Sequence, residues 1–205
     1  MRRKHIRGTV SCKVPRMRGR PRSEEARRAI LDTALRICHR DGYQQVTIKA
    51  IADEAGVGRQ TVYRWWPDRA QVLLDALIDL RTREPGLDRN TGDTLRDVER
   101  VLVRTFELTH EITGPALIGL MADAQTDDDL SARLQGTVIG PRRDALREIL
   151  RRGVESGELA ENVPLPLVVD FAFGTMWYRL LSRHAPVDDR LAADITAAIA
   201  RLLAR

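Results

Sequence analysis

The segment 47–69 constrains the fold most, because it describes two short amphipathic helices separated by glycines. Thr47 is predicted to cap the first helix, since its hydroxyl can accept a hydrogen bond from an unpaired backbone N–H of the first turn. Gly56 is predicted to end it in a left-handed conformation, which glycine adopts at little cost. Gly58 then opens the second helix. The apolar residues of the first helix recur at helical spacing, and they are Ile48, Ile51, Ala52 and Ala55.

The second helix carries a row of polar side chains that suits DNA recognition. Helical spacing turns Val62 and Trp66 inward. A guanidinium can donate two hydrogen bonds to guanine O6 and N7, and a glutamine amide can pair similarly with adenine. We therefore interpret Arg59, Gln60 and Arg64 as candidate base readers in a DNA major groove. Each could instead be a solvated or phosphate-bound side chain, and the helix pair could lack a nucleic-acid partner.

A phosphate contact is predicted just after the second helix. Pro67 stops the pattern and is well placed to begin a further helix that runs to about Arg83, because its missing N–H costs nothing in a first turn. Asp68 and Arg69 follow. Backbone N–H groups at a helix start, reinforced by a nearby cation, form a ready phosphate site.

These motifs resemble the N-terminal DNA-binding domain of the TetR family of transcriptional regulators. The resemblance is carried by Thr47, Ile51-Ala52, Ala55-Gly56-Val57, Thr61-Val62-Tyr63, Trp66-Pro67 and Arg69. It also fits the stretch from Ser23 to Arg40 as a first helix, with Ser23 as its predicted cap.

The resemblance implies two sets of DNA contacts. Base edges would be contacted by Lys49, Arg59, Gln60 and Arg64. The DNA backbone would be contacted by Thr47, Thr61, Tyr63, Trp65 and Arg69. Three positions depart from the family pattern: Gly58 stands where a capping serine is common, Trp65 where histidine or tyrosine is common, and Arg69 where lysine is usual.

Charge is distributed unevenly along the chain. Residues 1–70 carry a net charge of +10 and the remainder −5. This asymmetry indicates a DNA-binding half, because phosphate neutralisation supplies much of the affinity for duplex DNA. The segment 1–22 contains no acid, and we expect it to be a disordered basic tail. Its residues 18–22 could lie in an adjacent minor groove, or the tail could be a nonspecific cationic arm.

The remaining pattern predicts an all-α protein with two domains. Residues 23–83 would form a three-helix helix-turn-helix domain, and residues 84–205 a helical domain for ligand binding and dimerisation. Pro141 interrupts a long helical pattern and predicts a kink. Two widely spaced cysteines make a structural disulfide unexpected, which fits a cytoplasmic location. Since no apolar run reaches the length of a membrane span, we expect no membrane partner.

The last two helices are predicted to form a homodimer. Between Leu167 and Leu181 only Asp170 and Arg179 are charged, so this helix must be buried on nearly every side. A wide apolar stripe also marks the final helix, which starts near Asp188. Two such helices are typical of a four-helix bundle built by two subunits, and the TetR resemblance implies the same interface. Gly174 could allow close helix approach there or serve ordinary packing within one chain.

The resemblance also implies a pocket for an unknown small-molecule effector inside the second domain. Aromatic, methionine and isolated polar residues commonly line such pockets. The candidates are Phe106, His110, Met121, Gln125, Phe171, Met176, Trp177 and Tyr178. Most of them could instead be core residues.

These features favour a regulator over an enzyme. The four histidines and two cysteines form no metal-ligand spacing, and His110-Glu111 stands without a nucleophile motif or phosphate loop. We therefore expect no catalytic residues, no metal site and no cofactor. A purely architectural DNA binder would be basic throughout, whereas the second half is acidic. The hypothesis is a homodimeric, ligand-responsive repressor that binds a palindromic operator in double-stranded DNA and is released by a small molecule. The alternative is a transcriptional activator or a ligand-independent DNA-binding protein.

Overall fold

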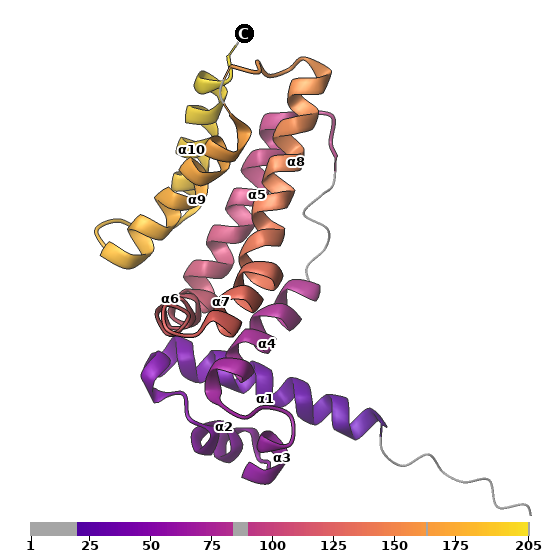
Figure 1. The fold of residues 1–205 in the computed structure, drawn as a ribbon, viewed down its shortest axis with the longest axis vertical. Coiled ribbons are helices and arrows are strands. Elements are labelled where there is room, and N and C mark those ends of the chain that lie inside the picture. The colour runs from indigo at the N-terminus through magenta and orange to yellow at the C-terminus, as the bar shows by residue number, and fades with distance from the viewer. Residues whose placement is uncertain (1–19, 84–89, 163, 205) are drawn as a thin grey trace, which may run out of the picture.

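The computed structural model describes residues 20–83, 90–162 and 164–204, and it confirms the all-α fold class (Figure 1). The first four helices form a small domain at one end: α1 (Arg20–Asp41), α2 (Ile48–Ala55), α3 (Arg59–Tyr63) and α4 (Arg69–Thr82). The second domain contains α5 (Thr94–Leu108), α6 (Gly114–Asp123), α7 (Asp128–Leu134), α8 (Gly140–Ser156), α9 (Leu165–Ser182) and α10 (Asp189–Leu202). None of the helices within the described ranges is long and apolar enough to cross a bilayer.

Two helix starts differ from the sequence prediction. Helix α1 begins at Arg20, so the predicted cap at Ser23 is instead an internal helical position, and the expected basic tail contributes its last three residues to α1. The rest of that tail, residues 1–19, lies outside the described residues. Helix α4 begins at Arg69 because the Asp68 carboxylate, rather than Pro67, sets its start: Asp68 Oδ1 accepts the Gln71 N–H at 2.9 Å. A carboxylate at this cap also faces the positive end of the helix dipole.

The helices of the first domain meet in one apolar core. Its fully buried members include Ile30, Ala34, Ile51, Val62 and Leu73, which come from all four helices. Cys38 also lies in this core, and burial raises the pKa of its thiol to about 11. The core continues into the second domain through Leu117, Leu120, Leu130 and Leu134 of α6 and α7. The two domains are therefore packed together rather than joined by a bare linker.

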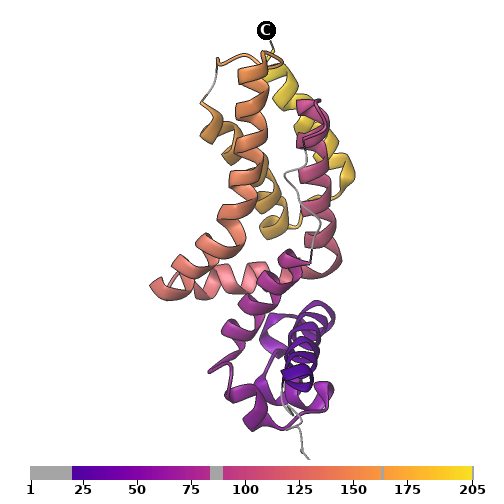
Figure 2. The same cartoon turned by 90° about the vertical axis from the view of Figure 1, so that its right-hand side faces the viewer.

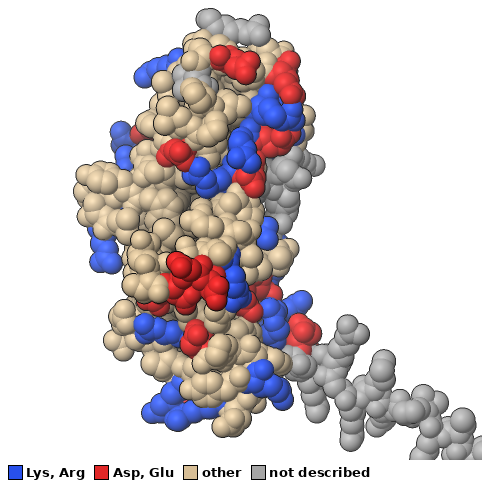
Figure 3. Space-filling view, in the orientation of Figure 1, with Lys and Arg blue, Asp and Glu red and all other residues tan. Residues whose placement is uncertain are grey.

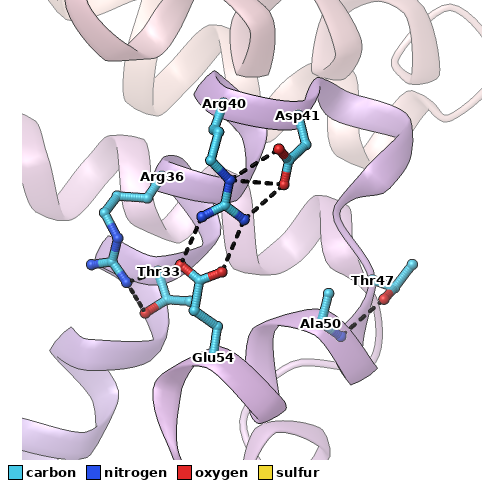
Figure 4. Close-up of polar contacts among 7 residues, drawn as sticks. All are labelled: Thr33, Arg36, Arg40, Asp41, Thr47, Ala50 and Glu54. Carbon is cyan, nitrogen blue, oxygen red and sulfur yellow. Dashed lines mark hydrogen bonds and ion pairs between the residues drawn. The ribbon is translucent and has the colours of Figure 1, made fainter.

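Ion pairs fix α2 on the surface of α1 (Figure 4). The Arg40 guanidinium donates to Asp41 Oδ1 at 2.9 Å and to Glu54 Oε2 at 3.0 Å. Arg36 reaches the other oxygen of Glu54 at 3.3 Å. The hydrogen bond from Arg40 lowers the pKa of Glu54 below its ordinary value. Because Glu54 lies in the last turn of α2, this cluster holds the first helix of the helix-turn-helix unit against α1.

The second domain consists of a bundle of four long helices and a pair of shorter helices that run across its base. Helices α5, α8, α9 and α10 share a core that includes Leu102, Phe106, Leu146, Ala172 and Ile199. Helices α6 and α7 run across the base of this bundle, and α6 packs against α1 and α4 (Figure 2). The helix-turn-helix unit and the long helices consequently lie at opposite ends of the molecule (Figure 1).

Two Gly-Pro steps interrupt the helices of the second domain. A π-helical turn, Thr109–Thr113, precedes Gly114-Pro115, and another, Gln135–Ile139, precedes Gly140-Pro141. Proline lacks an N–H and its ring clashes with the carbonyl four residues earlier, so the preceding turn widens. In each case the glycine N–H donates to the carbonyl five residues back. A Cβ on either glycine would stand 2.7 Å from that carbonyl oxygen, so glycine is needed at both steps. The second turn lies just before Pro141, where a kink was predicted.

Tyr43 forms a contact between the domains. Its hydroxyl donates to Asp123 Oδ2 of α6 at 2.6 Å, and the Arg69 guanidinium lies 4.7 Å from its ring centroid. Burial raises the pKa of Tyr43 above its ordinary value, and the bond to Asp123 acts in the same direction. The ring rests directly on Gly119: a Cβ there would stand 2.1 Å from Tyr43 Cγ.

Gly119→Ala is therefore expected to destabilise the protein. Overpacking of this kind costs about 1–3 kcal/mol, because the Tyr43 ring must leave its position. Urea unfolding followed by circular dichroism measures the change. Gly136→Ala is the matched control, since nothing lies within 4 Å of a Cβ at that helical position. Unchanged stability of Gly119→Ala would show that the ring does not rest where we describe it.

Candidate DNA-binding surface and effector cavity

The helix-turn-helix geometry follows from its caps. Thr47 Oγ1 accepts the Ala50 N–H at 3.0 Å, and Gly56 has φ 68° and ψ 31°, so both local predictions are confirmed. Figure 4 shows the Thr47 cap beside the ion-pair cluster. Gly58 precedes α3 in an extended conformation without a side-chain cap. The start of α3 is thus not fixed by a side-chain hydrogen bond from its cap residue.

Helix α3 packs against the rest of the domain on one side and leaves its polar side exposed to solvent. Val62 of α3 is buried, and so is Trp66, which follows the end of the helix at Tyr63. Trp66 Nε1 donates to Asp75 Oδ2 of α4 at 2.8 Å, and Trp65 meets Trp66 edge to face at 5.4 Å between centroids. Two aromatic rings and one hydrogen bond therefore hold the short helix in a fixed orientation.

The predicted base readers all lie on the solvent-exposed surface of this unit. Lys49, Arg59, Gln60 and Arg64 are all exposed, and Tyr63 has 52% of its surface accessible. The Arg64 guanidinium stacks over Trp65 at 5.2 Å, which restricts its motion. Figure 3 shows lysine and arginine gathered at this end of the molecule, over α2 and α3. An exposed cationic helix flanked by hydrogen-bond donors can enter a major groove.

The predicted backbone contacts are less uniform in their placement. Thr61 and Trp65 are half-buried beside the base readers, and Thr47 stays exposed while capping α2. Arg69 instead forms hydrogen bonds with the turn after α1. Its guanidinium donates to Gln44 O at 3.3 Å and to Gln44 Oε1 at 3.1 Å. The Asp68 carboxylate occupies the start of α4, where we expected free N–H groups. A phosphate contact from Arg69 stays a prediction, and it requires this guanidinium to exchange its Gln44 partners.

A narrow cavity lies in the second domain, between α4 and the long helices. Its apolar lining consists of Leu77, Leu80, Leu108, Leu117, Val138, Ile139, Phe173, Met176 and Trp177. Its polar lining consists of Arg81, Thr105, Thr109, Thr113, Arg142 and Arg143. The cavity volume is about 70 Å³, enough for a few water molecules. Both π-turns contribute to the wall, so the two Gly-Pro steps shape the space.

Comparison with known proteins identifies the family. Residues 30–76 match the model described as "Bacterial regulatory proteins, tetR family". Residues 88–199, more than half of the chain, match the model described as "Tetracyclin repressor-like, C-terminal domain". The chain belongs to the TetR family of transcriptional regulators. It is a DNA-binding regulator rather than an enzyme, and within its described residues no group of histidine, cysteine and acidic side chains could hold a metal ion.

Individual relatives of this TetR-family regulator span nearly its whole length. The HTH-type transcriptional regulator YdeS of Bacillus subtilis is 31% identical over 179 residues, which cover 87% of this chain and 89% of YdeS. The crystal structure of the TetR-family regulator SCO0332 superposes with a TM-score of 0.67 at 26% identity and covers 88% of this chain and 100% of its own. FadR from Bacillus subtilis, solved in complex with stearoyl-CoA, shares the fold with a TM-score of 0.68 at 18% identity and covers 85% and 98%.

Only some of the predicted pocket residues line the cavity of this TetR-family protein. Met176 and Trp177 line it. Phe106 is instead fully buried in the bundle core, and Met121 packs against the core of the first domain. Gln125 is exposed and donates to Met121 O, while His110 lines a separate open groove beside Arg179. Phe171 and Tyr178 face outward from α9, with 42% and 67% of their surfaces accessible.

Sequence reasoning missed the polar wall of the cavity. Thr105, Thr109 and Thr113 recur every four residues, and each hydroxyl donates to a backbone carbonyl of the same helix. Threonines at this spacing inside an apolar helix, followed by Gly-Pro, were the available signal. The cationic part of the wall comes from α4 and α8, which meet only in the folded chain.

Arg59→Ala and Arg64→Ala are each expected to weaken operator binding by about 1–3 kcal/mol and to relax preference at one base position. The loss arises because a bidentate contact to a base edge disappears. Fluorescence anisotropy with a selected operator and its single-base variants measures both effects. Arg147→Ala, an exposed change on α8, is the control. Equal weakening on every sequence would assign these side chains to phosphates instead.

Proposed function

We propose that the protein is a ligand-responsive repressor that binds a palindromic operator as a homodimer and is released when a small molecule fills the cavity. Three surfaces support this: the open donors of α3, an uncovered apolar face on α9, and a cavity whose wall includes α4. A repressor acts by occluding a promoter in chromosomal DNA, so we place it in the cytoplasm.

The exposed donors of α3 are the observation that carries the DNA-binding part. Their side chains have no role in the fold that would account for their type, since Arg59 and Gln60 are exposed and Arg64 only stacks on Trp65. Because Val62 and Trp66 are buried in the domain core, the exposed donors are held on a rigid surface. Rigid presentation favours sequence-specific contacts over loose electrostatic attraction.

The outer face of α9 supports the homodimer. Exposed residues recur along it at alternating spacings of four and three: Leu167, Phe171, Gly174, Tyr178 and Leu181. This is the spacing of a helix seam that packs against another helix. Nothing lies within 4 Å of a Cβ at Gly174, so a partner helix can approach closely there. Figure 3 shows a largely uncharged protruding edge over α9.

Helix α10 also presents small side chains to solvent. Ala193 and Ala197 are exposed and Ala200 is half-buried, so the helix offers a shallow surface beside the larger α9 residues. Two copies of α9 and α10 would form a four-helix bundle. Such a dimer can set two α3 helices roughly 34–36 Å apart, the separation of successive major grooves on one side of DNA.

The cavity supports release by a ligand. Pockets for drug-sized molecules usually measure roughly 300–1,000 Å³, so a ligand of that size must widen this one. One wall is α4, whose Asp75 holds Trp66 of the recognition unit. Moving α4 therefore shifts α3, and a ligand that prefers the widened state disfavours operator binding. FadR, which shares the fold, carries stearoyl-CoA in its solved complex.

Selection of DNA from a random oligonucleotide pool tests the repressor hypothesis. We expect enrichment of one palindrome whose half-sites lie about one helical turn apart. Binding that depends on salt alone, without an enriched palindrome, would overturn the specific-regulator proposal. Placing the selected site before a reporter gene then separates repression from activation.

Phe171→Glu combined with Tyr178→Glu is expected to convert the dimer into a monomer, because two carboxylates would face their symmetry mates in an apolar seam. Operator affinity should fall roughly hundredfold or more, since the two recognition units no longer bind as one. Sedimentation equilibrium and anisotropy on the same samples measure both changes. Gln125→Glu, an exposed change on another surface, is the control. A double variant that stays dimeric would exclude the α9 face as the interface.

A further inference from the structure

Arg81 has an unusual environment in the cavity wall. It lies in the last turn of α4, and its Nε is fully buried without a hydrogen-bond acceptor among the described residues. A buried donor on a charged group is costly to leave unpaired. Such groups are normally satisfied by protein, water or a ligand. The position of Arg81 therefore calls for an acceptor inside the cavity.

The charge of the lining points to the kind of acceptor. Three arginines contribute to the wall, and the described lining contains no aspartate or glutamate. Arg143 pairs with Asp170 of α9, and Arg142 Nη1 donates to Thr105 Oγ1 at 3.0 Å. Arg81 is therefore the arginine of this wall whose buried Nε lacks an acceptor within the part of the chain that the structure describes. Its positive charge favours an anion as that acceptor.

The threonines of the wall strengthen this assignment. Thr105 donates to Val101 O at 2.7 Å, Thr109 to Thr105 O at 2.8 Å, and Thr113 to Leu108 O at 3.0 Å. Because each hydroxyl hydrogen is used within the helix, these side chains supply no donor to a ligand. Among the described residues of the wall, the donor that remains unpaired is Nε of the Arg81 guanidinium. A ligand head group must therefore accept hydrogen bonds.

The opposite wall is apolar. Phe173, Met176 and Trp177 of α9 face the cavity, and Val138 and Ile139 of the second π-turn close it. A small hydrophilic anion would leave these side chains without contacts. An anion with an apolar body would satisfy both walls at once.

We propose that the effector is a small amphipathic anion, whose carboxylate or phosphate group is bound by Arg81 while its apolar part packs against α9. This inference rests on the proposed ligand response and names the chemical class of the ligand. Because Arg81 belongs to α4, the anion is held by the same helix that anchors the recognition unit through Asp75.

Calorimetric titration of the purified full chain tests the charge preference. The probes are octanoate, octyl phosphate and octanol, all below their aggregation limits. We expect the anions to bind at least about tenfold more tightly than octanol, because a hydrogen bond to a charged group replaces an unpaired donor. Comparing the two anions distinguishes a carboxylate head from a phosphate head. Equal binding of octanol, or no binding of either anion, overturns the proposal.

Variants of Arg81 test the residue assignment. Arg81→Met should abolish the preference for anions without weakening octanol binding, and should keep the ligand-free protein at least as stable, since it removes an unpaired donor. Arg81→Lys should retain a reduced preference, because it keeps the charge but loses the planar fork. Arg147→Met, exposed on α8 and outside the cavity, should behave as wild type. An anion preference that survives in Arg81→Met overturns the assignment.

Operator release measured in parallel separates this inference from the proposed function. If octanol releases the operator as well as octanoate does, ligand response stands and the anion assignment fails. If octanoate binds through Arg81 and the operator stays bound, the anion site stands and ligand-controlled repression fails. The two ideas therefore fail on different readouts.

Discussion

The packing of α4 between the two domains is the constraint on which the rest of the structure depends. Val72, Leu73 and Leu74 of this helix are fully buried, in a core shared with α1 and α6. Asp75 on the same helix accepts a hydrogen bond from the indole N–H of Trp66, and Arg81, six residues later, lines the cavity. Burial of three large side chains contributes several kcal/mol. Because that energy fixes the whole helix, the orientation of α3 and the shape of the cavity depend on one rigid element.

The two Gly-Pro steps provide the other condition for a cavity. Regular α-helices pack closely, so a bundle core seldom leaves space. A π-turn widens the helix and displaces the side chains that would otherwise fill the interior. The turns before Pro115 and Pro141 both border the cavity, one on each side of the α6–α7 crossing. The glycines at 114 and 140 are thus as important to the cavity as the residues whose side chains line it, because no larger residue fits against the widened turn.

Sequence reasoning succeeded where the determining interactions are local. Caps such as Thr47 and Gly56 act within one helical turn, and Val62 and Trp66 follow a single helical period, so the helix-turn-helix could be predicted in detail. The cavity depends on where α4, α8 and α9 meet, and helical spacing does not determine that meeting. Phe106 and Tyr178 are of residue types that commonly line pockets. In the folded chain, however, Phe106 lies in the core and Tyr178 lies on the surface. Arg69 shows the same limit, because its partner Gln44 is distant in the sequence.

Helix α9 offers a second route from the cavity to DNA, and its packing argues for α4 as the wall that moves. Phe173 and Met176 face the cavity, while Phe171 and Tyr178 lie on the outer face. In the proposed dimer α9 is packed on both sides, so displacing it would disrupt two apolar contacts at once. On its α7 side, α4 is held by the Asp75–Arg133 pair at 3.3 Å, which is partly exposed. Such pairs contribute little to stability, about 0–1 kcal/mol. Because α4 is a rigid element, it would move as one body in the proposed ligand response, and the Asp75–Trp66 hydrogen bond would pass that movement to the recognition helix.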